Sequence, residues 1–223
     1  MIDHPNIIIP FVKPSTSPAF GMEHIIHLSK DKKLKKVVAS AKPYRLTKRK
    51  NVCLRLCASI MSQQLSTRVA EVIFRRFLEL YNGEEPTPEQ VLNTPPETLR
   101  SIGLSNAKVS YVLNVARFAI EQGMDEKKLR KMSNEEIIQY LTQIKGVGQW
   151  TVEMILMFTL GREDVFAADD LGIQNAMIKL YKLDKENKKQ LREDMLRISS
   201  AWSPYRTFGC VYLWRWKDGV KET

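Results

Sequence analysis

Hydrophobic residues recur at helical spacing along most of the chain, and from residue 21 onward no stretch shows the sustained two-residue alternation of a half-buried strand. Glycine and proline mark the breaks between the helical segments, for example at Gly83, Pro95, Gly123 and Gly161. The pattern therefore predicts an all-α protein. We expect helices over residues 21–28, 31–41, 50–62, 66–81, 88–93, 96–101, 105–122, 134–143, 149–160, 171–182, 187–200 and 204–216.

The ends of the chain differ from this helical middle. Residues 1–20 carry four prolines around one apolar run, Ile7–Ile9, a composition typical of an extended arm laid on a surface. We expect residues 21–217 to form one helical domain and residues 218–223 to be a tail. The middle of the chain should form one lobe of this domain. The N-terminal and C-terminal helices should form the other, with an active cleft between the two lobes.

A glycine hairpin joins two of the expected helices. Ser133 is a typical helix start, and the apolar stripe that follows it ends at Ile144. Gly146 and Gly148 then flank one apolar residue, and the apolar pattern resumes at Trp150. Residues 134–160 therefore predict a helix-hairpin-helix, which grips the DNA backbone without reading sequence. Such a junction can also be purely structural, so its flanking residues decide the interpretation.

The hairpin has the features of an anion-binding site. Glycines leave main-chain N–H groups uncovered, and the positive end of a helix dipole follows at once. Lys145 precedes the glycines, and Thr151 lies in the first turn of the next helix. The chain has a formal net charge of +10, which makes a nucleic-acid phosphate the expected anion. In the basic stretch from Lys30 to Lys50, we expect Lys30–Lys36 to be mostly exposed and Lys48–Lys50 to lie near DNA.

Three segments together resemble a known family. Gly146–Thr151, followed by Asp164–Phe166 and the pair Asp169-Asp170, is similar to the motif of the helix-hairpin-helix, Gly/Pro-rich loop and aspartate (HhH-GPD) superfamily of DNA base-excision glycosylases. Ser59–Ser66 and the aromatic segment 202–215 are similar to its 3-methyladenine DNA glycosylase II branch. The resemblance runs from about residue 45 to about residue 217. The best-known bacterial member has an additional N-terminal α/β domain, and from the short leader here we expect no such domain, as in the compact, all-helical members of the family.

The resemblance implies a monofunctional DNA glycosylase that flips out alkylated purines, such as 3-methyladenine and 7-methylguanine, and hydrolyses the N-glycosidic bond. The family's catalytic carboxylate lies twenty residues after the hairpin tryptophan, which here is Trp150 and points to Asp170. An aspartate ahead of a helix is also a common N-cap, and both roles are compatible. Asp169 is expected to be structural. No histidine falls in the motif region to serve as a general acid.

Further site residues follow from the same resemblance. Trp150, Met154 and Trp214 match positions of the family's base pocket, where an aromatic face attracts a cationic base. For Trp202 and Tyr205 we expect core packing instead. Where the best-known relative has a leucine wedge, this chain has Gln64, with Leu65 next. The expected DNA-binding residues are Gln63, Gln64, Leu65, Ser66, Lys145, Gly146, Val147, Gly148 and Thr151. Alternatively, Gln63 and Ser66 cap the adjoining helix.

No cofactor is expected to be required. In relatives a monovalent cation, Na⁺ or K⁺, binds main-chain carbonyls at positions matching Thr142, Ile144 and Val147. The chain has three cysteines, Cys53, Cys57 and Cys210, too few for the four-cysteine iron–sulfur cluster of some superfamily members. Their odd number and apolar surroundings predict buried thiols in a reducing compartment.

The expected partner is double-stranded DNA with an alkylated base. We expect the protein to be a monomer and not to associate with a membrane. The compartment would be the cytoplasm of a bacterium or archaeon, or a eukaryotic nucleus.

Three alternative functions stay open. A bifunctional glycosylase/AP lyase would place a lysine nucleophile where Trp150 stands, and Lys145 is on the wrong side of the hairpin. A non-catalytic helix-hairpin-helix DNA-binding module would need neither Asp170 nor an aromatic pocket. An RNA-binding role would fit only the charge.

Overall fold

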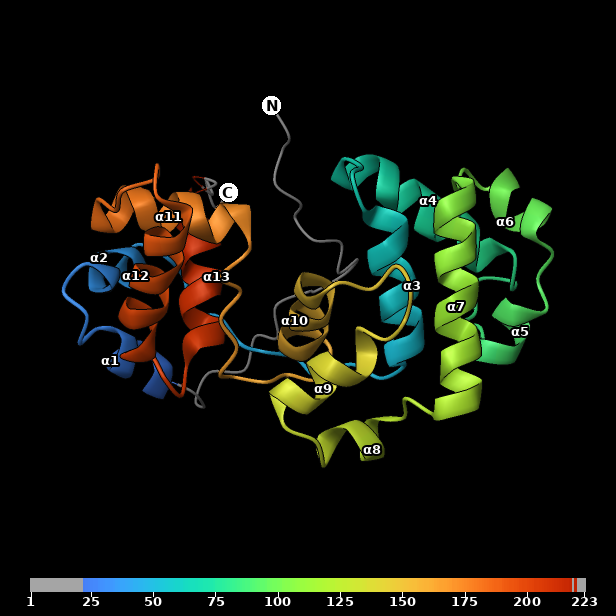
Figure 1. Ribbon diagram of the computed structural model, residues 1–223, viewed down its shortest axis with the longest axis horizontal. Helices are drawn as coiled ribbons and strands as arrows, with labels where there is room; N and C mark the ends of the chain where they lie inside the picture. The colour runs from blue at the N-terminus through green and yellow to red at the C-terminus, as the bar shows by residue number, and fades with distance from the viewer. Residues whose placement is uncertain (1–21, 218, 220–223) are drawn as a thin grey trace. The chain divides into compact units, whose positions relative to one another are not determined.

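The computed structural model describes residues 22–217 and residue 219, and within them every regular element is an α-helix, as predicted (Figure 1). The expected N-terminal arm and C-terminal tail lie outside the described residues, apart from Gly219. The helices are α1 Glu23–Leu28, α2 Leu34–Ala39, α3 Val52–Ser62, α4 Thr67–Glu79, α5 Pro88–Leu92, α6 Pro96–Ser101, α7 Asn106–Gln122, α8 Glu126–Arg130, α9 Asn134–Leu141, α10 Gln149–Phe158, α11 Leu171–Tyr181, α12 Lys188–Ser200 and α13 Arg206–Lys217.

One helix, α8, has no counterpart among the helices expected from the sequence. It is five residues long and follows its N-cap residue Asp125, whose side chain accepts a hydrogen bond from the main-chain N–H of Lys128 (3.0 Å). Leu129 is the only residue of α8 that is buried. A single turn with one apolar contact shows no repeat, and hydrophobic periodicity cannot reveal it.

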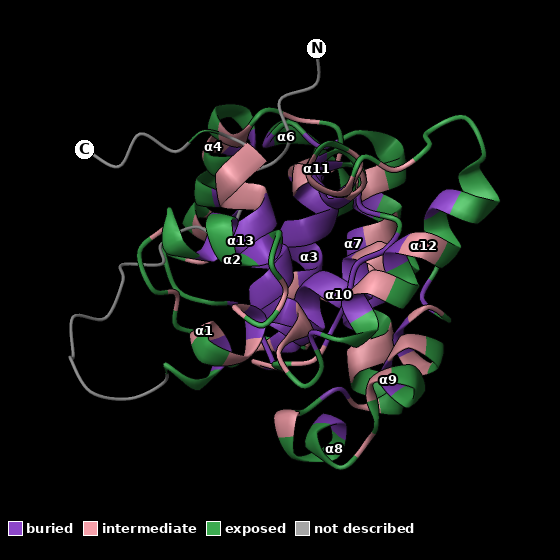
Figure 2. Cartoon of the chain, turned by 90° about the vertical axis from the view of Figure 1, so that its left-hand side faces the viewer, coloured by how far each residue is buried: buried purple, intermediate pink, exposed green. Residues whose placement is uncertain are grey.

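The first of two compact units contains Lys48–Leu160, and α3 lies at its centre. Nearly every residue of α3 is buried, and the helix packs against α4, α7 and α10 (Figure 2). Leu56, Ile60 and, from α4, Phe77 are completely inaccessible to solvent. Each such side chain contributes about 1.5–3 kcal/mol through burial. The apolar runs of the sequence thus build a core around one helix.

The second unit contains the described parts of Lys13–Thr47 and Gly161–Thr223. Here α13 packs against α2, α11 and α12. Trp202 and Tyr212 are fully buried, so the expected core position of Trp202 is confirmed. Their polar atoms have partners, as buried aromatic residues require. The Trp202 indole N–H donates to Asp31 (3.1 Å), and the Tyr212 hydroxyl hydrogen-bonds with Nε2 of His24 (3.0 Å).

Two further predictions concern cysteines and lysines. Cys53, Cys57 and Cys210 are all buried free thiols, as expected. Hydrogen bonding with Cys53, together with burial, raises the pKa of the Cys57 thiol well above its ordinary value. The lysines between Lys30 and Lys36 are all exposed, also as expected. Among the described residues, no helix is both long and apolar enough to cross a bilayer.

Candidate functional site

The hairpin lies between α9 and α10 in the first unit. The Ser133 side chain and the Glu136 carboxylate cap the start of α9 reciprocally, so the entry helix is well defined. The hairpin itself is closed by the main-chain N–H of Val147, which donates to the carbonyl of Ile144 (2.9 Å). This hydrogen bond reverses the chain between the two helices.

Gly146 is required by its surroundings as well as by its backbone. Its φ of +104° lies in the region that L side chains rarely adopt. A β-carbon at this position would lie 2.2 Å from Cγ of Tyr111 on α7. Next to Tyr111, Asn114 of α7 donates from Nδ2 to the carbonyl of Lys145 (3.3 Å). Helix α7 therefore contacts the hairpin through the side chains of Tyr111 and Asn114.

Gly148 has a different role. It is the N-cap residue of α10, with a φ of −93° and no side-chain cap. A β-carbon built there would meet no atom within 4 Å. Gly148 itself is exposed, as are Lys145 and Gln149 near it in the sequence. The start of α10 thus presents main-chain N–H groups beside a lysine, which is the arrangement of an anion site.

The predicted pocket and hairpin residues on α10 differ in exposure. Trp150 is part-exposed, whereas Met154, one turn later on the same face, has only 3% of its surface accessible. Thr151 and Val147 are also buried, at 3% and 5% exposed. Their side chains belong to the core, so any phosphate contact at these two positions comes from the main chain.

The segment Gln63–Ser66 forms a tight turn between α3 and α4. The main-chain N–H of Leu65 donates to the carbonyl of Ser62 (3.1 Å), and Gln64 has a φ of +59°. The Gln64 side chain is exposed, while Leu65 is part-buried. Ser66 is the N-cap residue of α4, but its side chain makes no capping hydrogen bond. Gln63 is the C-cap residue of α3.

Asp170 lies in the second unit, where it caps α11. Its Oδ1 accepts hydrogen bonds from the main-chain N–H of Ile173 (2.8 Å) and from the indole N–H of Trp214 (2.9 Å). The residue is 6% exposed, and the predicted N-cap role is confirmed. Its neighbour Asp169 is exposed and pairs with Arg192 (3.3 Å), consistent with a structural role.

Gly172 makes the contact between Asp170 and Trp214 geometrically possible. A β-carbon on Gly172 would lie 2.9 Å from Asp170 Oδ1 and 3.0 Å from Cδ1 of Trp214. A β-carbon at these distances would force the Asp170 carboxylate or the Trp214 indole to shift. Glycine in the first turn of α11 therefore leaves room for their contact.

The segment before Asp170 is tied to the start of α13. Asp164 accepts hydrogen bonds from the Arg206 guanidinium (2.7 and 3.0 Å) and from the Ser203 hydroxyl (2.8 Å). Burial would raise the pKa of Asp164, but these donors hold it below its ordinary value. The Thr207 hydroxyl donates to the carbonyl of Arg162 (2.7 Å). These bonds tie the segment that leads to Asp170 to the start of α13, the helix that carries Trp214.

The predicted site residues thus fall into two groups. Gln63–Ser66, Lys145–Gly148 and the pair Trp150 and Met154 belong to the first unit, and Asp170 and Trp214 to the second. The cleft between the lobes stays a prediction. The sequence analysis missed Gly172, although a glycine two residues after the key aspartate is a visible signal.

Side-chain ligands for a metal ion do not cluster in the described part of the chain, where no three His, Cys, Asp or Glu residues come together. Main-chain carbonyls are the remaining candidates. The Ile144 carbonyl accepts one hydrogen bond, from Val147, and a carbonyl oxygen has two lone pairs. It can therefore still serve as a ligand.

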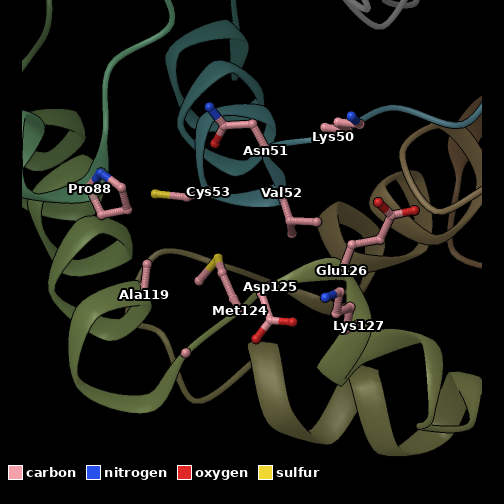
Figure 3. A pocket seen from close by; sticks show the side chains of 11 residues that line it. Lys50, Asn51, Val52, Cys53, Pro88, Ala119, Met124, Asp125, Glu126 and Lys127 are labelled. Carbon is pink, nitrogen blue, oxygen red and sulfur yellow. The ribbon is translucent and has the colours of Figure 1, made fainter.

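Two cavities in the first unit lie away from all of these residues. One, of about 750 Å³, is lined by Lys50, Cys53, Met124 and Lys127 among others (Figure 3). The other, of about 800 Å³, lies against α4 beside Arg55, Phe74 and Arg75. Neither is lined by a predicted catalytic or base-pocket residue.

Comparison with known proteins identifies the family of the chain. The model of the HhH-GPD superfamily of base excision DNA repair proteins matches residues 57–200. DNA-3-methyladenine glycosylase 1 of Schizosaccharomyces pombe is 39% identical over 186 residues, which are 82% of this chain and 80% of that protein. DNA-3-methyladenine glycosylase of Saccharomyces cerevisiae is 31% identical over 193 residues, covering 73% of this chain and 65% of that protein.

Solved structures give the same result. The S. pombe 3-methyladenine DNA glycosylase in complex with abasic DNA has a TM-score of 0.74 and 38% identity, over 86% of this chain and 95% of that one. A DNA-3-methyladenine glycosidase from Bacillus halodurans has a TM-score of 0.76 and 33% identity, over 92% and 91% of the two chains. The chain therefore belongs to the HhH-GPD superfamily of base excision DNA repair proteins.

Proposed function

We propose that this protein is a monofunctional DNA glycosylase that removes alkylated purines, 3-methyladenine and 7-methylguanine, from double-stranded DNA and so begins base excision repair. The observation that carries the proposal is the Asp170 carboxylate, which the N–H groups of Ile173 and Trp214 hold at the start of α11, in a chain of this family. The names of its relatives support the choice of 3-methyladenine as substrate.

Asp170 supplies the negative charge that the reaction needs. Loss of the base leaves an oxocarbenium-like deoxyribose, and a carboxylate near C1′ stabilises the positive charge that develops there. The carboxylate is oriented before the substrate arrives, because its Oδ1 is fixed by Ile173 and Trp214. Pre-orientation of this kind contributes about 3–4 kcal/mol in comparable electrostatic sites. Water then adds at C1′, and the proton goes to solvent.

The leaving group needs no acid from the protein. A purine methylated at N3 or N7 carries a positive charge, so it departs as a neutral base once the glycosidic bond breaks. The face of an aromatic ring attracts such a cation before departure. Trp150 and Trp214 are part-exposed and supply aromatic faces, and Met154 is buried one turn after Trp150 on α10.

The product is an intact abasic site. A lyase would attack C1′ with a lysine amine and form a Schiff base. Trp150 occupies the position of that lysine in the bifunctional members, and Lys145 precedes the hairpin glycines. The bifunctional alternative is therefore disfavoured.

The hairpin anchors the protein on the DNA backbone. The N–H groups at the start of α10 and the Lys145 ammonium bind a phosphate, which positions the enzyme without reading sequence. A monovalent cation, Na⁺ or K⁺, held by the carbonyls of Thr142, Ile144 and Val147 would add positive charge there. Gln64 and its neighbours enter the duplex where the damaged nucleotide leaves it. We propose that a monomer does this, in the cytoplasm or in a eukaryotic nucleus.

Base release from methylated duplex DNA tests the proposal. Purified protein is incubated with the duplex, and the released bases are separated by chromatography, while the DNA strand is examined before and after alkaline treatment. We expect 3-methyladenine and 7-methylguanine in solution and strand breaks only after alkali. Strand breaks without alkali, together with trapping by borohydride, would instead establish the lyase. Binding without any released base would leave only the non-catalytic module.

A further inference from the structure

The turn that carries Gln64 has an unusual residue at its most restrictive position. Gln63 has φ −50° and ψ 130°, Gln64 has φ +59°, and the N–H of Leu65 donates to the carbonyl of Ser62 (3.1 Å). These values define a type II turn over Ser62–Leu65, with Gln64 at its third position. That position favours glycine or asparagine, because φ is positive there. A type I turn would let the same glutamine adopt an ordinary negative φ.

The two turn types differ in the orientation of one peptide unit, the one between Gln63 and Gln64. In a type I turn this unit is rotated by about 180°, so the Gln63 carbonyl faces the opposite way. Lys108, near the start of α7, donates from Nζ to this carbonyl (2.7 Å) and to the carbonyl of Met61 (2.9 Å). Rotation of the peptide would break the shorter of these hydrogen bonds. The Lys108 ammonium therefore selects the type II turn.

We propose that Lys108 is a positioning residue for base excision, because its hydrogen bond to the Gln63 carbonyl holds Gln64 in the left-handed conformation that directs its side chain into the DNA. The inference rests on the proposed function, in which Gln64 enters the duplex. Two observations support it. Lys108 is part-buried, and loss of solvent lowers the pKa of its ammonium group. Placing the charged lysine here therefore costs desolvation free energy. The Gln64 side chain is exposed, so the fold gains no packing from its strained backbone.

A simpler alternative is that Lys108 only donates hydrogen bonds to carbonyls at the end of α3, as a cation at a helix C-terminus often does. The two roles differ in what they predict. A general stabilising contact would affect all substrates alike. A residue that positions Gln64 would matter most where a paired base must be forced out of the stack, and little where the lesion has no pairing partner.

Lys108→Met removes the donors and keeps the length of the side chain. Excision is measured under single-turnover conditions on two duplexes, with the same methylated purine either paired normally or placed opposite an abasic site. We expect about a tenfold or greater loss on the paired lesion and less than about a threefold loss on the unpaired lesion, since a small misplacement of a positioned group is costly. Lys128→Met is the matched control, because Lys128 also donates to a main-chain carbonyl, that of Gln122 (2.6 Å). It should leave both rates unchanged.

Gln64→Gly gives a second, independent measurement. Glycine adopts either turn at no cost and carries no side chain, so Lys108→Met should have no further effect in the Gln64→Gly background. Should Lys108→Met fail to fold, Lys108→Gln is measured in its place, since the shorter amide cannot make both hydrogen bonds.

Equal losses on the two duplexes, an equal loss in Lys128→Met, or additive effects with Gln64→Gly would each overturn the positioning role. A wild-type protein that releases no base from either duplex would instead refute the proposed function itself.

Discussion

The indole N–H of Trp214 donates to Oδ1 of Asp170 over 2.9 Å, and this is the same oxygen that caps α11 by accepting the N–H of Ile173. From the sequence, Trp214 was predicted only as a wall of the base pocket. Its geometry adds a second function, because a hydrogen bond to a carboxylate is stronger than one between neutral groups and fixes the direction of the acceptor. Trp214 thus orients the group that we propose as catalytic.

Trp214→Phe separates the two functions of this tryptophan. Phenylalanine keeps an aromatic face but has no N–H, so Asp170 loses the hydrogen bond from the indole. We expect the single-turnover rate of excision to fall by about tenfold or more, the usual cost of removing a hydrogen bond to a charged group. Trp214→Ala should lose more, because the aromatic face is lost too. Both variants should bind undamaged duplex like the wild type. Excision by Trp214→Phe at the wild-type rate would show that the hydrogen bond has no catalytic consequence.

Substrate preference should follow the charge of the lesion. Without a general acid, excision depends on how good a leaving group the damaged base already is. The cationic bases 3-methyladenine and 7-methylguanine should be released readily, and neutral hypoxanthine slowly or not at all. A panel of duplexes with one defined lesion each, measured at saturating enzyme, provides the comparison. Faster release of hypoxanthine than of 3-methyladenine would mean that the pocket protonates its leaving group.

Gly172→Ala should damage activity more than stability. The added methyl group would lie 2.9 Å from Asp170 Oδ1, so the carboxylate or the Trp214 indole must move. A displacement of about 1 Å can cost about a hundredfold in rate. Alanine favours a helix over glycine by up to about 1 kcal/mol, which offsets part of the clash.

Thermal unfolding and single-turnover excision of the Gly172→Ala variant are therefore measured together. Asn175→Ala, at an exposed position of the same helix, serves as the control. Normal excision by Gly172→Ala would mean that the site tolerates the shift and that the Asp170–Trp214 contact is not needed.

The two hairpin glycines should respond differently to substitution. Gly146→Ala places a methyl group against the Tyr111 ring at a positive φ, so we expect about 1–3 kcal/mol of lost stability. Gly148 has open space and a negative φ, so Gly148→Leu should fold normally. It should weaken binding to damaged and undamaged duplex alike, because it covers the N–H groups that face the phosphate.

Binding isotherms at two salt concentrations, with unfolding curves, distinguish these outcomes for the hairpin. Unchanged affinity of Gly148→Leu for undamaged duplex would exclude the hairpin as the anchor.

Local patterns made most of the fold predictable. The long helices carry apolar stripes, α7 ends at Gly123, and the N-cap role of Asp170 follows from its place before such a stripe. Helix α8 was not predicted, because its only buried residue is Leu129. Its start depends on one side-chain hydrogen bond, and the spacing of hydrophobic residues gives no sign of such a bond.

Contacts between distant parts of the chain could not be predicted in the same way. Trp214 is 44 residues from Asp170, and Lys108 is 45 residues from Gln63. No periodicity links such pairs, because they meet only through the packing of whole helices. Gly146 was recognised as a turn residue, but its need to avoid Tyr111 depends on how α7 packs behind the hairpin.

The most direct test of the account is the excision of one 7-methylguanine from a defined duplex by Asp170→Asn under single-turnover conditions. Asparagine is as good an N-cap as aspartate, so the variant should fold and bind damaged DNA while lacking only the charge at C1′. We predict a loss of about a hundredfold or more in the rate of base release. Asp169→Asn, which removes an exposed ion pair with Arg192, should stay close to the wild type. Base release by Asp170→Asn at the wild-type rate would contradict the assignment of Asp170 as the catalytic carboxylate.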